Sequence, residues 1–154
     1  MTITHLLHQA ACGAIAAAGF GVLFNVAGRL LPWCAATGAL ALAVRTGLLD
    51  VGWSLEAASF AAAIAVGAAV HLMRRRTGAF RDLLDVTGCI PMVPGSFAAK
   101  ALIGLFALTT SKVANEQETL ITATQFTLRV IVTIGAIGTG LAIPAYMRRR
   151  RQVH

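Results

Sequence analysis

The stretch Ile90-Pro91-Met92-Val93-Pro94-Gly95-Ser96 lies inside an otherwise apolar run from about Thr87 to Thr110. Its two prolines remove two backbone donors and clash with the preceding helical turn. Gly95 permits a left-handed backbone, and Ser96 is a typical N-cap residue for a new helix. In a membrane, non-helical backbone is tolerated only where protein buries it or where it lines an aqueous cavity. The stretch therefore predicts a broken helix with a site beside it.

Composition places the chain in the membrane class. Of its 154 residues, 57% are hydrophobic and 12% are charged, whereas about a quarter of the residues in an ordinary soluble domain are charged. The formal net charge is +7. However, the basic residues gather at the ends of apolar runs, which is typical of membrane topology and not of a nucleic-acid-binding face. We expect an all-α integral membrane protein with a single transmembrane domain over residues 1–154.

Apolar runs of membrane-spanning length occur five times in the chain. We place the spans at about 5–26, 33–49, 55–73, 87–110 and 120–143. The fourth contains the Pro-x-x-Pro-Gly break, and residues 77–86 before it are expected to form a short amphipathic helix on the membrane surface. The second run is the weakest because it contains Arg45. If that run does not cross, the chain has four spans and its N-terminus lies inside.

Basic residues are distributed unevenly between the predicted loops. With five spans and the N-terminus outside, the cytoplasmic segments hold nine arginines and the outer segments hold Lys112 alone. The arginines are Arg29, Arg74 to Arg76, Arg81 and Arg148 to Arg151. Because positively charged loops stay in the cytoplasm, we expect an N-out, C-in orientation.

Two cations fall near the middle of predicted spans, Lys100 in the fourth and Arg129 in the fifth. Each costs about 3 kcal/mol to place there, and the spans hold no acidic residue except Glu56 at an edge. The free N–H groups of a restarted helix also attract anions. We therefore expect a carboxylate site formed by the Pro94-Gly95-Ser96 backbone and Lys100, with Arg129 as a second clamp. In the alternative, both cations pair with carboxylates of another subunit or with helix carbonyls.

A small residue or an amide recurs every four positions in the first span, at Gly13, Ala17, Gly21 and Asn25. This stripe is expected to face another helix. Arg45 lies about one turn from the end of its own run. Both a side chain that snorkels to the interface and a role in lining the substrate pathway fit that position.

No catalytic motif is found in the sequence. Cys12, Cys34 and Cys89 lack metal or redox spacing and are interpreted as small buried residues. His5 and His8 are three residues apart, but no third ligand is nearby. Because nucleotide-binding loops and hydrolase triads are also missing, we expect no enzyme, no cofactor and no metal site.

Several of these segments carry a family resemblance, which spans about Ala14 to Pro144. The chain resembles the small, YjjB-like subunit of the threonine/serine exporter family. The matching positions are Gly19-Phe20, Phe24-Asn25-Val26, Arg29, Trp33-Cys34-Ala35, Gly38, Arg45 and Ile90 to Gly95. The resemblance implies a multi-pass protein of the bacterial inner membrane that works with a larger, YjjP-like subunit. It favours Pro91, Pro94, Gly95, Asn25 and Arg45 as site residues over Lys100 and Arg129, which match no motif of the family.

The resemblance also implies candidate substrates. Single-chain members export threonine and serine, and the split pair is associated with succinate export. Five short spans enclose little volume, so we expect the larger subunit, or further copies of this chain, to complete the pathway. We favour succinate, because the spans offer no carboxylate for the ammonium group of an amino acid. Threonine or serine export, and a purely structural subunit, are the alternatives.

Overall fold

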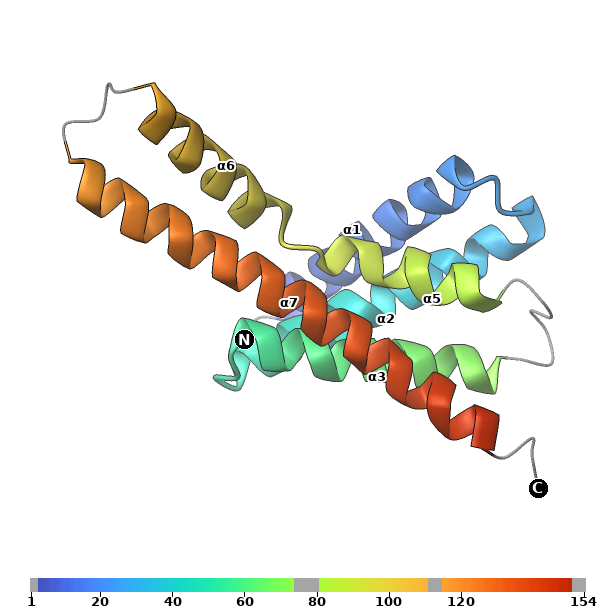
Figure 1. Cartoon of the computed structure of the whole chain (residues 1–154). Helices are drawn as coiled ribbons and strands as arrows, with labels where there is room; N and C mark the ends of the chain where they lie inside the picture. Colours follow the sequence, from blue (N-terminus) through green and yellow to red (C-terminus); the bar gives the residue numbers. More distant parts are fainter. Residues whose placement is uncertain (1–2, 74–80, 111–114, 151–154) are drawn as a thin grey trace. The chain divides into compact units, whose positions relative to one another are not determined.

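All regular elements among the described residues of the computed structural model are helical (Figure 1). The structure describes residues 3–73, 81–110 and 115–150, without the side chains of 81–82 and 148–150. The α-helices are α1 (Ile3–Leu23), α2 (Leu31–Asp50), α3 (Leu55–Leu72), α5 (Arg81–Cys89), α6 (Gly95–Thr109) and α7 (Glu116–Arg150). Two short 3-10 helices, η1 (Gly28–Leu30) and η3 (Ile90–Met92), precede α2 and follow α5.

The expected class, an all-α membrane protein, is confirmed. Among the described residues, α1, η1 with α2, α3 and α7 are each long and apolar enough to cross a membrane. The segments Leu83–Met92 and Gly95–Thr109 together make a fifth candidate, interrupted between them. Local signals mark two helix starts: Pro32 lies in the first turn of α2, and Ser54 Oγ accepts a hydrogen bond of 3.2 Å from the backbone N–H of Ala57 at the start of α3.

For residues 77–86 we expected a short amphipathic helix on the membrane surface. Residues 77–80 lie outside the described residues, and α5 confirms a helix over the rest, whereas its separation from the fourth run is wrong. Its position on the membrane surface stays a prediction. Helix α5 continues through Cys89 into η3, so this segment and the first part of the fourth run are one element. Leu84 is fully buried. The polar residues of this segment made it resemble a surface helix, although its other face packs into the protein.

The chain divides into two compact units, which we describe separately. The bundle unit comprises Met1–Met92 and Ala136–His154, and the hairpin unit comprises Val93–Gly135. Figure 1 shows the hairpin unit as α6 lying beside the first part of α7. In the bundle unit, α2 contacts α1, α3 and α5.

Close contact between α1 and α2 depends on small residues. Gly13, Ala17 and Gly21 are the buried residues of α1. A Cβ atom added at Gly13 would lie 2.5 Å from the carbonyl oxygen of Gly38, so neither backbone leaves room for a larger side chain. The predicted stripe is thus confirmed for these three residues and wrong for Asn25, which is exposed beyond the end of the helix.

The contact between α3 and the last part of α7 is of the same kind. A Cβ atom added at Gly140 would lie 2.7 Å from the carbonyl oxygen of Phe60, and one at Gly67 would lie 3.1 Å from Pro144 Cγ. Gly135 and Gly138 of α7, by contrast, have no atom within 4 Å of such a Cβ. On α7, therefore, close approach depends on Gly140.

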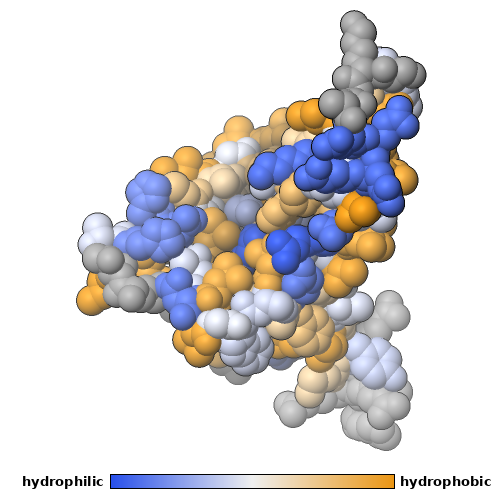
Figure 2. All heavy atoms as spheres, turned by 90° about the vertical axis from the view of Figure 1, so that its left-hand side faces the viewer, coloured by the Kyte–Doolittle hydropathy of each residue, from blue (hydrophilic) through white to orange (hydrophobic). Residues whose placement is uncertain are grey.

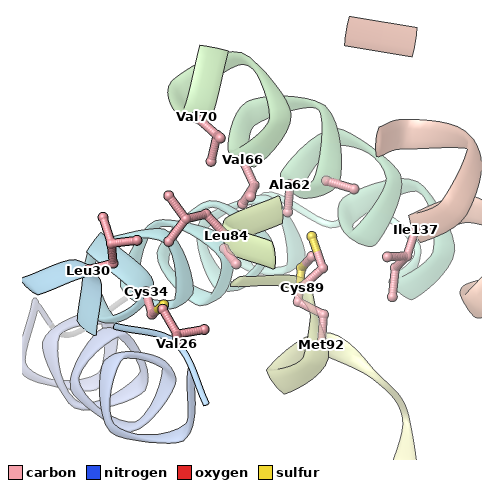
Figure 3. Close-up of a cluster of buried hydrophobic side chains, with 12 residues drawn as sticks. Val26, Leu30, Cys34, Ala62, Val66, Val70, Leu84, Cys89, Met92 and Ile137 are labelled. Atoms are coloured by element: carbon pink, nitrogen blue, oxygen red, sulfur yellow. The ribbon is translucent and has the colours of Figure 1, made fainter. Parts of the chain in front are cut away.

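Buried apolar side chains from α2, α3, α5 and α7 meet in the core of the bundle unit (Figure 3). Leu84 lies between the side chains of α2 and those of α3, with Met92 at one end of the cluster. Cys34 and Cys89 are buried, as expected, whereas Cys12 is exposed. Both buried thiols act here as small apolar side chains.

Apolar side chains also reach the surface, as lipid contact requires. Hydrophobic atoms cover much of the visible face, and hydrophilic residues gather in separate patches (Figure 2). On α6, Ile103 and Phe106 are 70% and 73% exposed. Such exposure would be costly in water and is ordinary in a bilayer.

Candidate functional site

The broken helix restarts at Pro94, two residues earlier than the sequence indicated. Pro94 is the N-cap of α6, with φ −79° and ψ 63°, and its carbonyl oxygen accepts hydrogen bonds of 3.1 Å from Phe97 and Ala98. These angles form an inverse γ-turn, in which the Gly95 N–H donates to the Val93 carbonyl at 2.8 Å. The expectation of Ser96 as N-cap is therefore wrong, because the turn at Pro94 already starts the helix.

Gly95 does not use the freedom that suggested a left-handed turn. Among the described residues, Gly52 is the glycine with positive φ, so Gly95 is in the right-handed region. It is exposed, and a Cβ atom there would meet no atom within 4 Å. Pro91 lies half-buried in η3, and Ser96 is exposed in the first turn of α6. The start of α6 thus leaves exposed backbone at Gly95 and Ser96.

Arg45 reaches the broken helix from α2. Its guanidinium donates a hydrogen bond of 2.9 Å to the Met92 carbonyl oxygen, at the last residue of η3. The side chain is half-buried. Neither of the two roles that we had considered for Arg45 anticipated this bond to the backbone.

Asn25 ends α1. Its φ is 56°, and its N–H donates to the Val22 carbonyl at 3.0 Å while the Val26 N–H donates to the Gly21 carbonyl at 2.9 Å. This pair of bonds is a Schellman motif, in which asparagine tolerates the left-handed conformation better than most residues. The residue therefore has a structural role that needs no substrate. Its predicted binding role stays a prediction.

Lys100 and Arg129 belong to one cluster in the hairpin unit, each beside an aromatic ring of the other helix. Lys100 Nζ lies 5.6 Å from the ring centre of Phe126, and Arg129 Cζ lies 5.3 Å from that of Phe97. The two rings are 5.6 Å apart. Cation–π contacts of this kind stabilise charge where water is scarce. We call these four residues the cation–aromatic cluster.

A cavity of about 210 Å³ opens beside this cluster. It lies between α6 and the start of α7 and is lined by Lys100, Gly104, Glu118, Thr119, Thr122 and Ala123. Gly104 brings the helices together there, because a Cβ atom at this position would lie 2.9 Å from that of Ala123. The volume is below the roughly 300–1,000 Å³ of pockets for drug-sized ligands. It suits a small metabolite.

The charges of this cavity have opposite signs. Both Lys100 and Glu118 are exposed, and in the part of the chain that the structure describes no ion pair joins them. The Asn115 amide donates a weak hydrogen bond of 3.4 Å to Glu118 Oε2. A cation and an anion that line one cavity without neutralising each other offer partners to both ends of a small polar molecule.

Glu118 is the residue that the sequence analysis missed. We had assigned it to a loop ending at Thr119, whereas α7 begins at Glu116. The available signal was its position, because acidic residues are enriched in the first turn of a helix. Of the site residues predicted from the sequence, the cavity lining contains Lys100. It contains neither Arg129 nor the residues of the break.

Comparison with known proteins agrees with this membrane architecture. No solved structure matches the chain. The family model described as "Threonine/Serine exporter, ThrE" matches residues 9–147, which is most of the chain and includes all its candidate site residues. The chain belongs to the threonine/serine exporter family, a family of membrane transporters.

Proposed function

We propose that this chain is the small subunit of a two-component exporter that moves a small amino acid, threonine or serine, out of the bacterial cytoplasm. Its location is the inner membrane, with the N-terminus outside and the C-terminus inside, because arginines would otherwise lie outside. It transports and does not catalyse a covalent reaction.

The observation that carries this proposal is the cavity shared by Lys100 and Glu118. The substrate carboxylate is placed at the Lys100 ammonium and the substrate ammonium at the Glu118 carboxylate. Thr119 and Thr122 line the same cavity, and their hydroxyl groups suit the hydroxyl of threonine or serine. Our preference for succinate rested on the lack of a carboxylate in the spans, and Glu118 at the start of α7 removes that reason.

Succinate remains the second candidate because of the cation–aromatic cluster. Lys100 and Arg129 lie beside the same pair of rings, and a dicarboxylate binds best to two cations. In that case Glu118 would repel the substrate. The two candidates therefore make opposite predictions for the removal of this carboxylate.

A larger subunit is expected to complete the pathway. The hairpin unit exposes apolar side chains on both helices, including Phe106 of α6 and Ile131 of α7. Its cavity opens at the surface instead of crossing the protein. A second copy of this chain is the alternative partner, and a subunit that stabilises the larger one without touching substrate is the alternative role.

Efflux from cells that lack their own exporters tests this proposal. Threonine, serine and succinate efflux would be compared for the chain alone and for the chain with the larger subunit. We expect threonine and serine efflux only with both subunits. Efflux from cells that express only this chain would refute the need for a larger subunit. Efflux of succinate without efflux of threonine or serine would refute the amino-acid substrate.

Substitutions in the cavity then separate a binding role from a structural one. Glu118→Gln should lower threonine efflux about tenfold or more, because it removes the charged partner of the ammonium group. Lys100→Met should abolish efflux of either substrate. Glu116→Gln is the matched control, since Glu116 lies in the same turn of α7 but does not line this cavity. Normal efflux by both cavity variants would refute the site.

A further inference from the structure

Two side chains of α2 lie beside the backbone of α5 and η3. The Thr37 hydroxyl donates its short hydrogen bond, of 2.9 Å, to the Cys34 carbonyl of its own helix. Thr37 Oγ1 lies 3.5 Å from the Leu84 carbonyl oxygen, and Arg45 donates to the Met92 carbonyl at 2.9 Å. Both pairs are 47 residues apart in the chain. From the first pair to the second, the position on α2 and the position on the α5–η3 segment both advance by eight residues, which is about two helical turns. Helix α2 and the α5–η3 segment therefore run parallel, in constant register.

Close packing maintains this register. A Cβ atom at Gly88 would lie 2.7 Å from Thr37 Cβ, so α5 can approach α2 this closely only with glycine at that position. The side chains around the contact, Leu84, Cys89 and Met92, are buried. Helix α5 therefore has little freedom to slide along α2. Arg45 is held at the end of η3.

The Met92 carbonyl needs a donor from elsewhere because the helix breaks directly after it. In a continuous helix it would accept from the N–H four residues later. Here the γ-turn intervenes: Pro94 has no N–H, and the Gly95 N–H bonds to Val93. Arg45 supplies a charged donor in its place. Its positive charge also complements the negative end of the helix dipole.

We propose that Arg45 is a positioning residue that clamps the last carbonyl of η3 and so sets the backbone from which α6 restarts. The proposal concerns the break and does not make Arg45 a ligand of the substrate. It rests on the proposed export function only for the transport arm of its test.

Hydrogen–deuterium exchange of the purified full chain in lipid nanodiscs tests the clamp without any substrate. Arg45→Met keeps the apolar stem and removes the donors. Exchange across residues 90–98 should become about threefold faster or more, while the start of α3 is unchanged. Arg45→Lys, which keeps a charged donor, should stay within about twofold of the parent chain. Arg29→Met is the matched control, since Arg29 is exposed in η1.

An unchanged exchange rate at 90–98 in Arg45→Met would overturn the proposal. If that variant does not insert into the membrane, Arg45→Gln decides the question. It keeps a neutral donor of shorter reach and should exchange faster than Arg45→Lys. Equal exchange in these two variants would overturn the clamp as well.

The transport arm distinguishes positioning from substrate binding. With the larger subunit present, Arg45→Met should lower the maximal efflux rate about tenfold and leave KM within about twofold, with Arg45→Lys recovering most of the rate. A KM that rises while the maximal rate is kept would make Arg45 a substrate ligand and overturn the proposal. If no variant and no parent chain shows efflux, the proposed function fails, while the exchange experiment still decides the clamp.

Discussion

The bundle unit and the hairpin unit are stabilised in different ways. In the bundle unit, glycines let α1 approach α2, and α7 approach α3, until backbone and side chain touch. An apolar core with side chains from α2, α3, α5 and α7 adds to this packing (Figure 3). In the hairpin unit, α6 and the first part of α7 meet at Gly104 and at the cation–aromatic cluster. Among the described residues of this unit, the buried hydrophobic side chains are those of Ala101 and Ala123.

This difference suggests that the bundle unit provides stability and that the hairpin unit provides the substrate contacts. A tightly packed unit tolerates little change, whereas a hairpin with few buried residues depends on lipid or protein around it. The charged groups that we assign to the substrate, Lys100 and Glu118, both lie on the hairpin unit. Substitutions should therefore affect stability most in the bundle unit and transport most in the hairpin unit.

The largest loss of stability is expected from Gly38→Ala. The added Cβ would overlap the Gly13 carbonyl oxygen and Ala17 Cβ. We expect a cost of about 3 kcal/mol, since neither backbone can yield without moving a helix. Gly19→Ala is the matched control because its Cβ would meet nothing within 4 Å. Thermal unfolding in detergent measures both, and equal melting temperatures would refute the tight α1–α2 contact.

Gly88→Ala should destabilise the chain by about 2 kcal/mol, because its Cβ would press on Thr37. Gly95→Ala, in the open space at the start of α6, should change stability by less than about 0.5 kcal/mol. The same melting assay compares the two. A larger loss for Gly95→Ala would mean that the glycine of the break is needed for folding itself.

Within the hairpin unit, Phe126→Leu should cost about 1–2 kcal/mol locally. It removes the ring beside Lys100 and the partner of Phe97. Hydrogen exchange of α6 reports this change, with Phe106→Leu as control since Phe106 is 73% exposed. If both variants exchange alike, the cation–aromatic cluster does not hold the helices together.

The smallest effect on stability is expected from Glu118→Gln, at less than about 0.5 kcal/mol, because the carboxylate is exposed. Its melting temperature should equal that of Glu116→Gln. A melting temperature of Glu118→Gln that is clearly higher or lower than that of Glu116→Gln would show that Glu118 contributes to folding. That result would count against its assignment to the substrate.

Hydropathy and proline chemistry were sufficient to predict the four long helices and the presence of a break in the fourth apolar run. Apolar runs of spanning length predict α1, α2, α3 and α7 because lipid exposure demands them. The two prolines and the glycine of the 90–96 stretch predict the break, although a single proline need not end a helix, as Pro144 inside α7 shows. The stripe at Gly13, Ala17 and Gly21 predicted a helix contact because small residues four positions apart lie on one face of a helix. All these features depend on residues near one another in the chain.

The site depends on register between helices, which one sequence does not encode locally. The bond from Arg45 to Met92 requires α2 and η3 to lie parallel with a fixed offset. For Lys100 and Glu118 to line one cavity, α6 and the start of α7 must pack in one register, although hydropathy assigned the two positions to a span and a loop. Likewise, the N-cap of α6 is Pro94 and not the predicted Ser96, because a γ-turn starts the helix in place of a side-chain cap.

Binding of threonine to the purified two-subunit complex, measured by calorimetry, tests the central claim most directly, namely that the hairpin cavity holds both charged ends of an amino acid. Glu118→Gln should weaken threonine binding about tenfold or more, with Glu116→Gln unchanged. Threonine that binds Glu118→Gln as tightly as it binds the parent complex would contradict the account.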